Sequence, residues 1–226
     1  MNRAHPKTVD IHALAAAVNG AFPSLDATDR RIAMATYRVL ARGVTATTAA
    51  VADTAGVAAA DVAARMAHWP AIFRDNSGAV VGFWGLSYTE VSPHTIQLDG
   101  VKLWAWCAWD TLFLPARLGS QLHIRSICPV TGRTIEIDVA PDRIVQAPSD
   151  VAVSFLNPDN RFDGDVITGF CHFIHFFASR AAGVEWVAKH SGTFLLSLAE
   201  AFELARLVND RFADALPPLT HGDQPR

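Results

Sequence analysis

The composition of the sequence and the spacing of its apolar residues change near residues 70–77, and this change limits the folds that the chain can adopt. Before this point the chain is rich in alanine, and its apolar residues recur with the spacing of amphipathic helices. Gly43 and Gly56 are placed to end two of these helices, and Ser24 and Asp26 provide a start for another. The sequence therefore predicts helices over residues 8–19, 27–41, 47–55 and 58–68.

Beyond residue 79 the apolar and polar residues alternate, which is typical of strands. Asp99-Gly100 and Thr131-Gly132 each separate two such runs, and both pairs favour a hairpin turn. The expected elements are strands over 80–88, around the two hairpins, over 151–156 and over 170–177, with helices over 108–118, 182–190 and 196–212.

Together these elements predict an α+β fold with two parts. Residues 1–79 form an N-terminal helical part, which resembles a winged helix because short helices precede a hairpin at residues 75–78. Residues 80–215 form a mixed, mostly antiparallel β-sheet part with flanking helices. The Pro-rich polar stretch over 216–226 is expected to be a disordered tail.

Composition narrows the classes of function. Half of the residues are hydrophobic and 18% are charged, so the 226-residue chain can bury a core as one large domain or two small ones. The net charge of -3 gives no general attraction to nucleic acid or to an anionic membrane. The N-terminus has no unbroken apolar run, and the three cysteines form no disulfide framework, so we expect a cytoplasmic protein with free thiols.

Two cysteines and one carboxylate lie in unusually aromatic surroundings. Cys107 and Asp110 belong to the segment WAWCAWDTLFLPA, and Cys171 belongs to GFCHFIHFFAS. Apolar surroundings raise the pKa of thiols and carboxylic acids, so such groups stay neutral until a ligand draws off a proton. A soft metal does so, because it prefers thiolate and binds only the deprotonated ligand.

The spacing of these residues suggests how they meet. A helix that begins at or just before Cys107 would place it and Asp110 on one face. On a strand, Cys171 would share its face with Phe173 and His175, while His172 would point the other way. Taken singly, each cysteine is better explained as a core residue, since free cysteine is often buried.

Three fragments of the chain are similar, in order, to the alkylmercury lyases, also called organomercurial lyases. They are Trp106–Leu112, with the pattern aromatic-Cys-Ala-x-Asp-Thr-Leu; Cys128–Gly132, with Cys-x-x-Thr-Gly; and Phe170–Ser179. The resemblance runs from about Leu86 to Phe212 and more loosely through the helical region before it. Members of the family often carry a second cysteine directly after the one that matches Cys171, where this chain has His172.

The resemblance implies cleavage of the carbon–mercury bond of alkyl or aryl mercurials by protonolysis, giving a hydrocarbon and Hg(II) without a cofactor. Cys107 and Cys171 would hold the mercury, Asp110 would contact it and carry the proton, and Trp106 would contact the organic group. Cys128 matches a family cysteine that is not catalytic, so a structural role is expected. The implied partners are the organomercurial, solution thiols and a mercuric reductase that accepts Hg(II).

A different class of function uses the same residues. A winged-helix metal-responsive regulator, or a thiol-metal binding protein without turnover, would need the cysteines but not Asp110. The helix expected over 58–68 offers only Arg65 and His68 beside Asp61, which is few cations for phosphate contacts. A zinc site from Cys128, Cys171, His172 and His175 lacks the usual ligand spacing, and no phosphate-binding loop or Gly-x-Ser-x-Gly motif is present.

Overall fold

The computed structural model describes residues 9–158 and 165–213, and the expected tail at 216–226 lies outside them. The N-terminal part contains α1 (Ile11–Ala21), α2 (Ala27–Ala41), α3 (Thr48–Ala55) and α4 (Ala59–Met66), which confirms the four predicted helices. The start of α2 is fixed by reciprocal hydrogen bonds between Asp26 and Asp29, and α3 ends at Gly56 in the left-handed conformation that glycine tolerates best.

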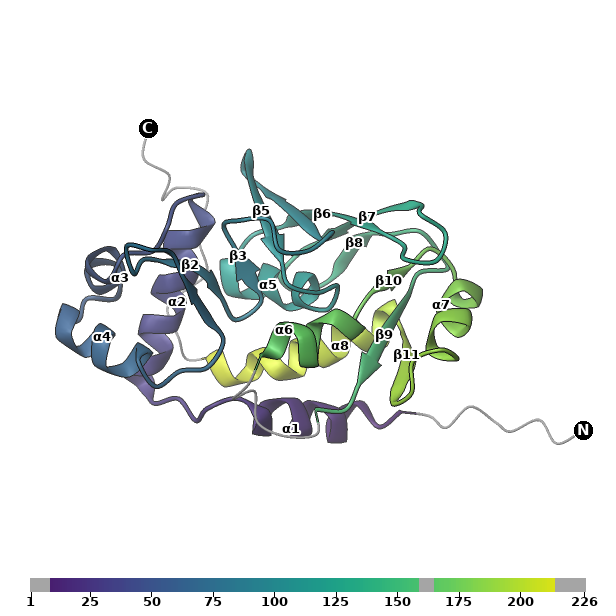
Figure 1. The fold of residues 1–226 in the computed structure, drawn as a ribbon, viewed down its shortest axis with the longest axis horizontal. Coiled ribbons are helices and arrows are strands. Elements are labelled where there is room, and N and C mark those ends of the chain that lie inside the picture. The colour runs from purple at the N-terminus through teal and green to yellow at the C-terminus, as the bar shows by residue number, and fades with distance from the viewer. Residues whose placement is uncertain (1–8, 159–164, 214–226) are drawn as a thin grey trace, which may run out of the picture.

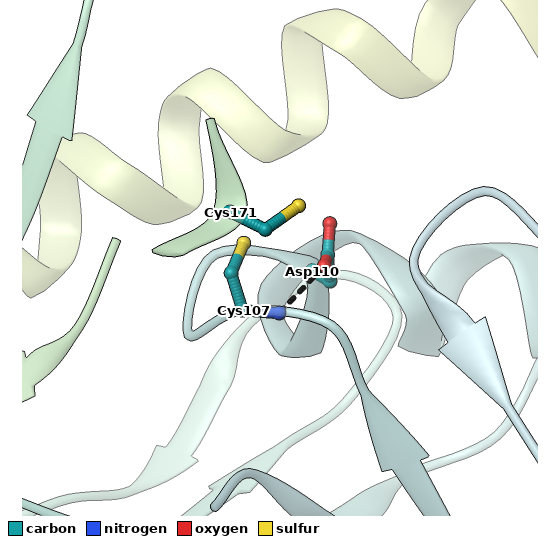
Figure 2. A group of neighbouring side chains, drawn as sticks. All are labelled: Cys107, Asp110 and Cys171. Atoms are coloured by element: carbon teal, nitrogen blue, oxygen red, sulfur yellow. Dashed lines mark hydrogen bonds between the residues drawn. The ribbon is translucent and has the colours of Figure 1, made fainter. Parts of the chain in front are cut away.

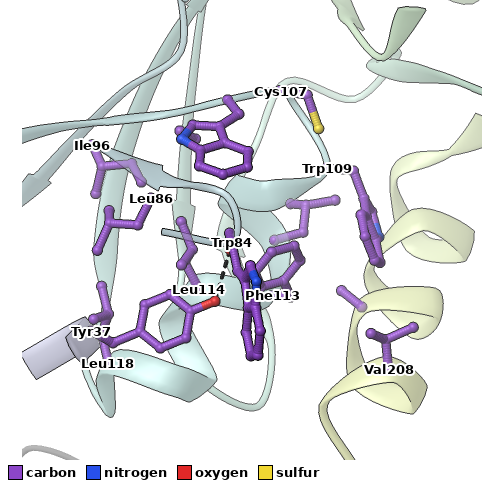
Figure 3. Packing of buried hydrophobic residues seen from close by; sticks show 14 of the residues in the cluster. Tyr37, Trp84, Leu86, Ile96, Cys107, Trp109, Phe113, Leu114, Leu118 and Val208 are labelled. Atoms are coloured by element: carbon purple, nitrogen blue, oxygen red, sulfur yellow. Dashed lines mark hydrogen bonds between the residues drawn. The ribbon is translucent and has the colours of Figure 1, made fainter. Parts of the chain in front are cut away.

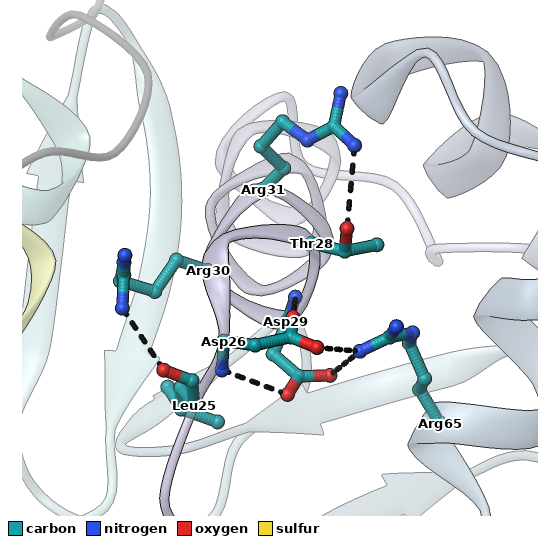
Figure 4. A network of polar contacts seen from close by, with 7 residues as sticks. All are labelled: Leu25, Asp26, Thr28, Asp29, Arg30, Arg31 and Arg65. Carbon is teal, nitrogen blue, oxygen red and sulfur yellow. Dashed lines mark hydrogen bonds and ion pairs between the residues drawn. The ribbon is translucent and has the colours of Figure 1, made fainter.

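An ion-pair network ties α4 to the beginning of α2 (Figure 4). The Nη1 atom of Arg65 lies 2.8 Å from a carboxylate oxygen of Asp26 and 2.7 Å from one of Asp29. Arg65 is the only arginine that the sequence offers along this helix, and it is engaged within the protein. The helix α4 would be the candidate recognition helix of a winged-helix regulator, and its main cation is thus paired within the protein.

Within the described residues, eight strands form one antiparallel sheet in the order β1-β2-β3-β5-β4-β6-β7-β8. The predicted hairpins at Asp99-Gly100 and Thr131-Gly132 are present, between β4 and β5 and between β6 and β7. The strands are β1 (Ile72–Arg74), β2 (Val80–Phe83), β3 (Leu86–Ser87), β4 (Thr95–Leu98), β5 (Val101–Ala105), β6 (Leu122–Ile127), β7 (Thr134–Val139) and β8 (Ile144–Gln146).

A second sheet of three antiparallel strands has the order β10-β9-β11. Its strands are β9 (Ala152–Leu156), β10 (Phe176–Phe177) and β11 (Thr193–Ser197). The other elements of this half are α5 (Asp110–Leu118), α6 (Val166–Gly169), the 3-10 turn η1 (Cys171–Phe173), α7 (Arg180–Val187), α8 (Leu198–Asn209) and the 3-10 turn η2 (Asp210–Phe212). The α+β fold with mostly antiparallel strands and flanking helices is therefore confirmed.

The helices α5 and α8 lie in the middle of the molecule (Figure 1), with α2, α3 and α4 at one end and the small sheet with α7 at the other. Trp109, just before α5, is almost fully buried, and its indole N–H donates a 3.1 Å hydrogen bond to the carbonyl of Ala201 in α8. Burying so large a ring while satisfying its donor stabilises the contact between the two helices. No helix in the described ranges is long and apolar enough to cross a membrane.

Three sequence predictions differ from the structure. The strand expected over 170–177 is formed only at Phe176–Phe177, because residues 171–173 make a 3-10 turn. The run over 80–88 is broken into β2 and β3 by a turn at Trp84-Gly85, where both residues have positive φ. A strand, β11, lies between the two closing helices and was not predicted, although both helices are present as α7 and α8.

Candidate active site

Three separate elements bring Cys107, Asp110 and Cys171 together (Figure 2). Cys107 lies in the turn after β5, Asp110 is the first residue of α5, and Cys171 begins η1. The two sulfur atoms and a carboxylate oxygen lie within 4.8 Å of one another. All three residues are buried, and no other group of three or more candidate metal ligands is found in the described part of the chain.

Backbone hydrogen bonds fix the positions of the three side chains. The Oδ2 atom of Asp110 accepts a 2.8 Å hydrogen bond from the backbone N–H of Cys107. The next residue, Ala108, donates its N–H to the carbonyl of Ile174, whose own N–H binds the carbonyl of Cys171. The turn that carries Cys107 and the turn that carries Cys171 are therefore joined directly through main-chain atoms.

This geometry corrects two expectations about how the residues meet. Cys107 and Asp110 do not share a helical face, because α5 begins only at Asp110 and Cys107 precedes it. They meet because the carboxylate folds back onto the N–H of Cys107, as in a helix N-terminal turn. Cys171 likewise does not lie on a strand, so the strand alternation expected for its neighbours Phe173 and His175 is wrong.

Burial controls the protonation of the site. Removal from water raises the pKa of Asp110 to about 7, although hydrogen bonds from Cys107 and the charge of Arg117 oppose this rise. Burial also raises the pKa of Cys107 well above its usual value, and the neighbouring Cys171 and Asp110 raise it further. For Cys171 the hydrogen bond from Cys107 lowers the pKa, but burial and the charge of Asp110 outweigh it, so its pKa is also raised.

The two thiols of the cluster interact directly with each other. The Cys107 thiol also interacts with the carboxylate of Asp110, so a proton that leaves Cys107 has an acceptor beside it.

A hollow opens directly beside the cluster. Its empty volume is about 360 Å³, part of which is open to solvent, and Asp110 and Cys171 form one side of it. Trp106, the residue predicted to contact the organic group, is among the residues that line it. The remaining lining residues are mostly aromatic or aliphatic: Phe22, Ala71, Trp84, Gly85, Trp109, Phe113, Val166 and Phe170.

Gly85 is a part of the site that the sequence interpretation missed. A Cβ atom at this position would lie 2.8 Å from Cγ and Oδ1 of Asp110 and 2.8 Å from Cζ of Phe113. The carboxyl group therefore packs directly against the glycine backbone, which also has the positive φ of 94° that glycine tolerates. The available signal was a glycine inside an alternating strand pattern, which often marks a close backbone approach.

Cys128 stands apart from the cluster. It lies at the end of β6, where its carbonyl accepts the N–H of Gly132 and its N–H binds the carbonyl of Arg133. Burial raises its pKa, but hydrogen bonds from Thr131 and the Ala178 backbone outweigh this, so the pKa is lowered overall. His172, beside Cys171, is exposed, and no zinc-like group of Cys128, Cys171, His172 and His175 forms among the residues described.

Comparisons with known proteins all match this chain to alkylmercury lyases. The family model for MerB, alkylmercury lyase, matches residues 87–209. An alkylmercury lyase of Bacillus cereus is 38% identical over 181 residues, covering 80% of this chain and 81% of the relative. An alkylmercury lyase of Staphylococcus epidermidis (strain ATCC 12228 / FDA PCI 1200) is 39% identical over 149 residues, covering 66% of this chain and 67% of the relative.

The fold is also similar to that of a solved structure, described as the crystal structure of the mercury-bound form of MerB2. The TM-score is 0.70 at 22% identity, with 91% of this chain and 100% of the other covered. The matched family region contains the turn of Cys107, the start of α5 and the turn of Cys171. The chain belongs to the alkylmercury lyase family, and it is an organomercurial lyase rather than a winged-helix regulator.

Proposed function

We propose that Cys107, Cys171 and Asp110 together cleave the carbon–mercury bond. The observation that carries this proposal is the buried cluster of two thiols and one carboxyl group, with their ligand atoms within 4.8 Å of one another. Thiolate is the protein ligand that a soft ion such as Hg(II) prefers. The carboxyl group, with its pKa raised to about 7 by burial, can hold a proton near neutral pH.

Capture begins at Cys171, because Cys171 lines the hollow beside the cluster, whereas Cys107 is not among its lining residues. The Cys171 thiol gives up its proton to solvent as its sulfur displaces the ligand X from R–Hg–X, so that R–Hg–S forms and X leaves. Cys107 then binds the same mercury as its proton passes to Asp110, whose carboxylate lies beside the Cys107 thiol. A second thiolate increases the electron density on the carbon atom bound to mercury, so that this carbon becomes basic enough to accept a proton.

Cleavage is the transfer of that proton from Asp110 to carbon. The carbon–mercury bond breaks as the carbon–hydrogen bond forms, so R–H leaves and Hg(II) remains bound by Cys107 and Cys171. The overall step consumes one Cys107 proton and needs no oxidant, reductant or cofactor. Trp106, with the other aromatic residues around the hollow, contacts the organic group and excludes water from the reacting atoms.

Removal of the product requires a further thiol partner. Solution thiols can exchange with the two cysteine ligands, and a mercuric reductase can accept the Hg(II) that they carry away. Three cysteines without a disulfide suit a reducing compartment, so we place this reaction in the cytoplasm.

The direct test is hydrocarbon release. Purified protein with excess thiol should release benzene from a phenylmercury salt, whereas Cys107→Ser and Cys171→Ser should release none, because a hydroxyl is a poor ligand for a soft metal. Cys128→Ser is the matched control: it should retain turnover per folded molecule while losing stability, by about 1–3 kcal/mol if the buried hydroxyl is left unpaired. Wild-type rates in a folded Cys171→Ser variant would disprove the two-thiolate mechanism.

A further inference from the structure

The N-terminal part and its junction with the sheet supply one wall of the active-site hollow. Phe22 follows α1, Ala71 precedes β1, and Trp84 lies in the turn between β2 and β3. All three line the same hollow as Asp110 and Cys171. Trp84 also precedes Gly85, against which the carboxyl group of Asp110 packs.

Two residues of this wall have backbone conformations that are unfavourable for their side chains. Ala71 has φ of 58° and Trp84 has φ of 37°, both in the region that favours glycine. Such a conformation is energetically unfavourable for a residue other than glycine, and it persists only where the surroundings enforce it. Residues held in this way are frequent at binding and catalytic sites.

Hydrogen bonds hold Trp84 in this conformation. The hydroxyl of Tyr37 donates a 2.7 Å hydrogen bond to the Trp84 carbonyl (Figure 3), and the guanidinium of buried Arg117 donates to the same hydroxyl. The indole N–H of Trp84 donates to the carbonyl of Pro70 at 2.9 Å. The main chain and the ring of Trp84 are therefore anchored separately.

The Trp84 ring is also packed on several sides. It stacks on Phe83 at a centroid distance of 4.4 Å, lies 5.0 Å from Trp69 and meets Phe22 edge-on at 5.9 Å. Only 2% of the residue is exposed. A ring with so few alternative positions cannot move aside for a larger ligand without displacing its neighbours.

We infer that Trp84 determines the size of the organic group that this lyase accepts, with Phe22 completing the same wall. This inference rests on the proposed function of Cys107, Asp110 and Cys171. The mercury atom is bound by the cysteines, so its organic group must extend from the cluster into the hollow. The fixed indole then limits how wide that group can be, and the strained backbone at Trp84 is explained by the position that the ring has to occupy.

The test uses two arylmercurials that differ in width, phenylmercury and 1-naphthylmercury. The measured quantity is the ratio of their kcat/KM values. Trp84→Phe should raise the naphthyl-to-phenyl ratio by about 10-fold or more, which is the usual effect of a small change in pocket volume on selectivity. Phe22→Leu should change the ratio in the same direction. A ratio measured on one preparation does not depend on how much of the variant is folded.

Trp69→Phe is the control, since Trp69 packs against Trp84 but is not among the residues lining the hollow. It should leave the ratio at the wild-type value. An unchanged ratio in both Trp84→Phe and Phe22→Leu, or an equal change in Trp69→Phe, would overturn the inference. Failure of the proposed function is recognised separately, because the wild-type protein would then release neither benzene nor naphthalene.

Discussion

Burial determines which side chains of the site carry a proton and therefore what each can do. Asp110 is 6% exposed and Cys107 is fully buried, and this burial raises the pKa of Asp110 to about 7 and the pKa of Cys107 well above its usual value. In water a carboxyl group near pH 7 would be ionised and could not act as an acid. The aromatic surroundings thus allow Asp110 to hold, near neutral pH, the proton that the proposed mechanism has it receive from Cys107 and pass to carbon.

The three candidate site residues were identified in the sequence, and the structure brings them together, but their geometry could not be predicted. The aromatic neighbours of Cys107, Asp110 and Cys171 in the sequence predict that these residues are buried. The resemblance to the family predicts that they lie together. Gly85 carries no reactive group, so its role appears only when the carboxyl group of Asp110 is seen packed against it. Trp84 was missed for a similar reason, because its positive φ is a property of the fold rather than of the residue type.

A substitution at Gly85 tests whether turnover depends on the position of the Asp110 carboxyl group. We expect Gly85→Ala to lower kcat by roughly 10²-fold, because the added methyl group would displace the Asp110 carboxyl from the reacting carbon. Gly78→Ala is a matched control, since Gly78 has a similar φ of 84° but nothing within 4 Å of its Cβ position. Both variants should lose stability, measured by urea unfolding, and only Gly85→Ala should lose turnover per folded molecule. Equal turnover in the two would show that Asp110 does not depend on Gly85.

Helices were predicted more accurately than the segments that carry the cysteines. The bounds of α2 follow from local signals, since its capping residues Asp26 and Asp29 lie in the sequence beside it. The run at 170–177 was predicted as a strand because it is rich in aromatic residues, which favour sheets. Its first half instead forms η1, where the N–H of Ile174 binds the carbonyl of Cys171 and the carbonyl of Ile174 accepts the N–H of Ala108. This last contact is long-range, so no local pattern could have indicated it.

The helix α8 contacts the segment between Cys107 and Asp110 through the hydrogen bond from Trp109 to Ala201. Its N-terminus is capped by Ser197, whose hydroxyl accepts the N–H of Glu200 while the Glu200 carboxylate binds the N–H of Ser197. Ser197→Ala should lower the free energy of unfolding by about 0.5–2 kcal/mol, since it removes this cap. Turnover at a temperature where the variant stays folded should be unchanged. Ser149→Ala, at an exposed turn position, is the control, and an equal stability in the two variants would contradict the capping role.

At the scale of the whole molecule, the N-terminal part contributes residues to the hollow beside Asp110 and Cys171. Arg65, the main cation of the candidate recognition helix, is engaged by Asp26 and Asp29, while Phe22 and Ala71 face the active site. The eight-stranded sheet begins with β1, which precedes residue 80, so the two parts of the chain share it. The division into residues 1–79 and 80–215 stays a prediction.

The buried carboxyl group makes the stability of the whole protein depend on pH. Between about pH 4 and pH 7, Asp110 is protonated in the folded protein, where its pKa is about 7, and ionised in the unfolded chain, where its pKa is 3.8. The folded state therefore binds more protons, and the free energy of unfolding falls as pH rises, by up to about 1.4 kcal/mol per pH unit. Above pH 7 this contribution is constant. Urea unfolding of wild type and Asp110→Asn at intervals from pH 4 to pH 8 should show the stability of wild type relative to the variant falling as pH rises, because the other titrating groups contribute to both proteins. Parallel curves would contradict the raised pKa.

The central claim is that two thiolates capture the organomercurial and Asp110 supplies the proton that releases the hydrocarbon. The most direct measurement is native mass spectrometry of Asp110→Asn after mixing with phenylmercury, combined with quantification of benzene. Asparagine keeps the size and hydrogen bonding of the carboxyl group but has no proton to donate at neutral pH. Asp165→Asn serves as the control, because Asp165 also interacts electrostatically with Cys171 but lies outside the cluster. We predict that Asp110→Asn retains the intact phenylmercury adduct while benzene release falls by at least about 10²-fold, and that Asp165→Asn cleaves normally. Benzene release by Asp110→Asn at the wild-type rate, with bare mercury on the protein, would contradict the account.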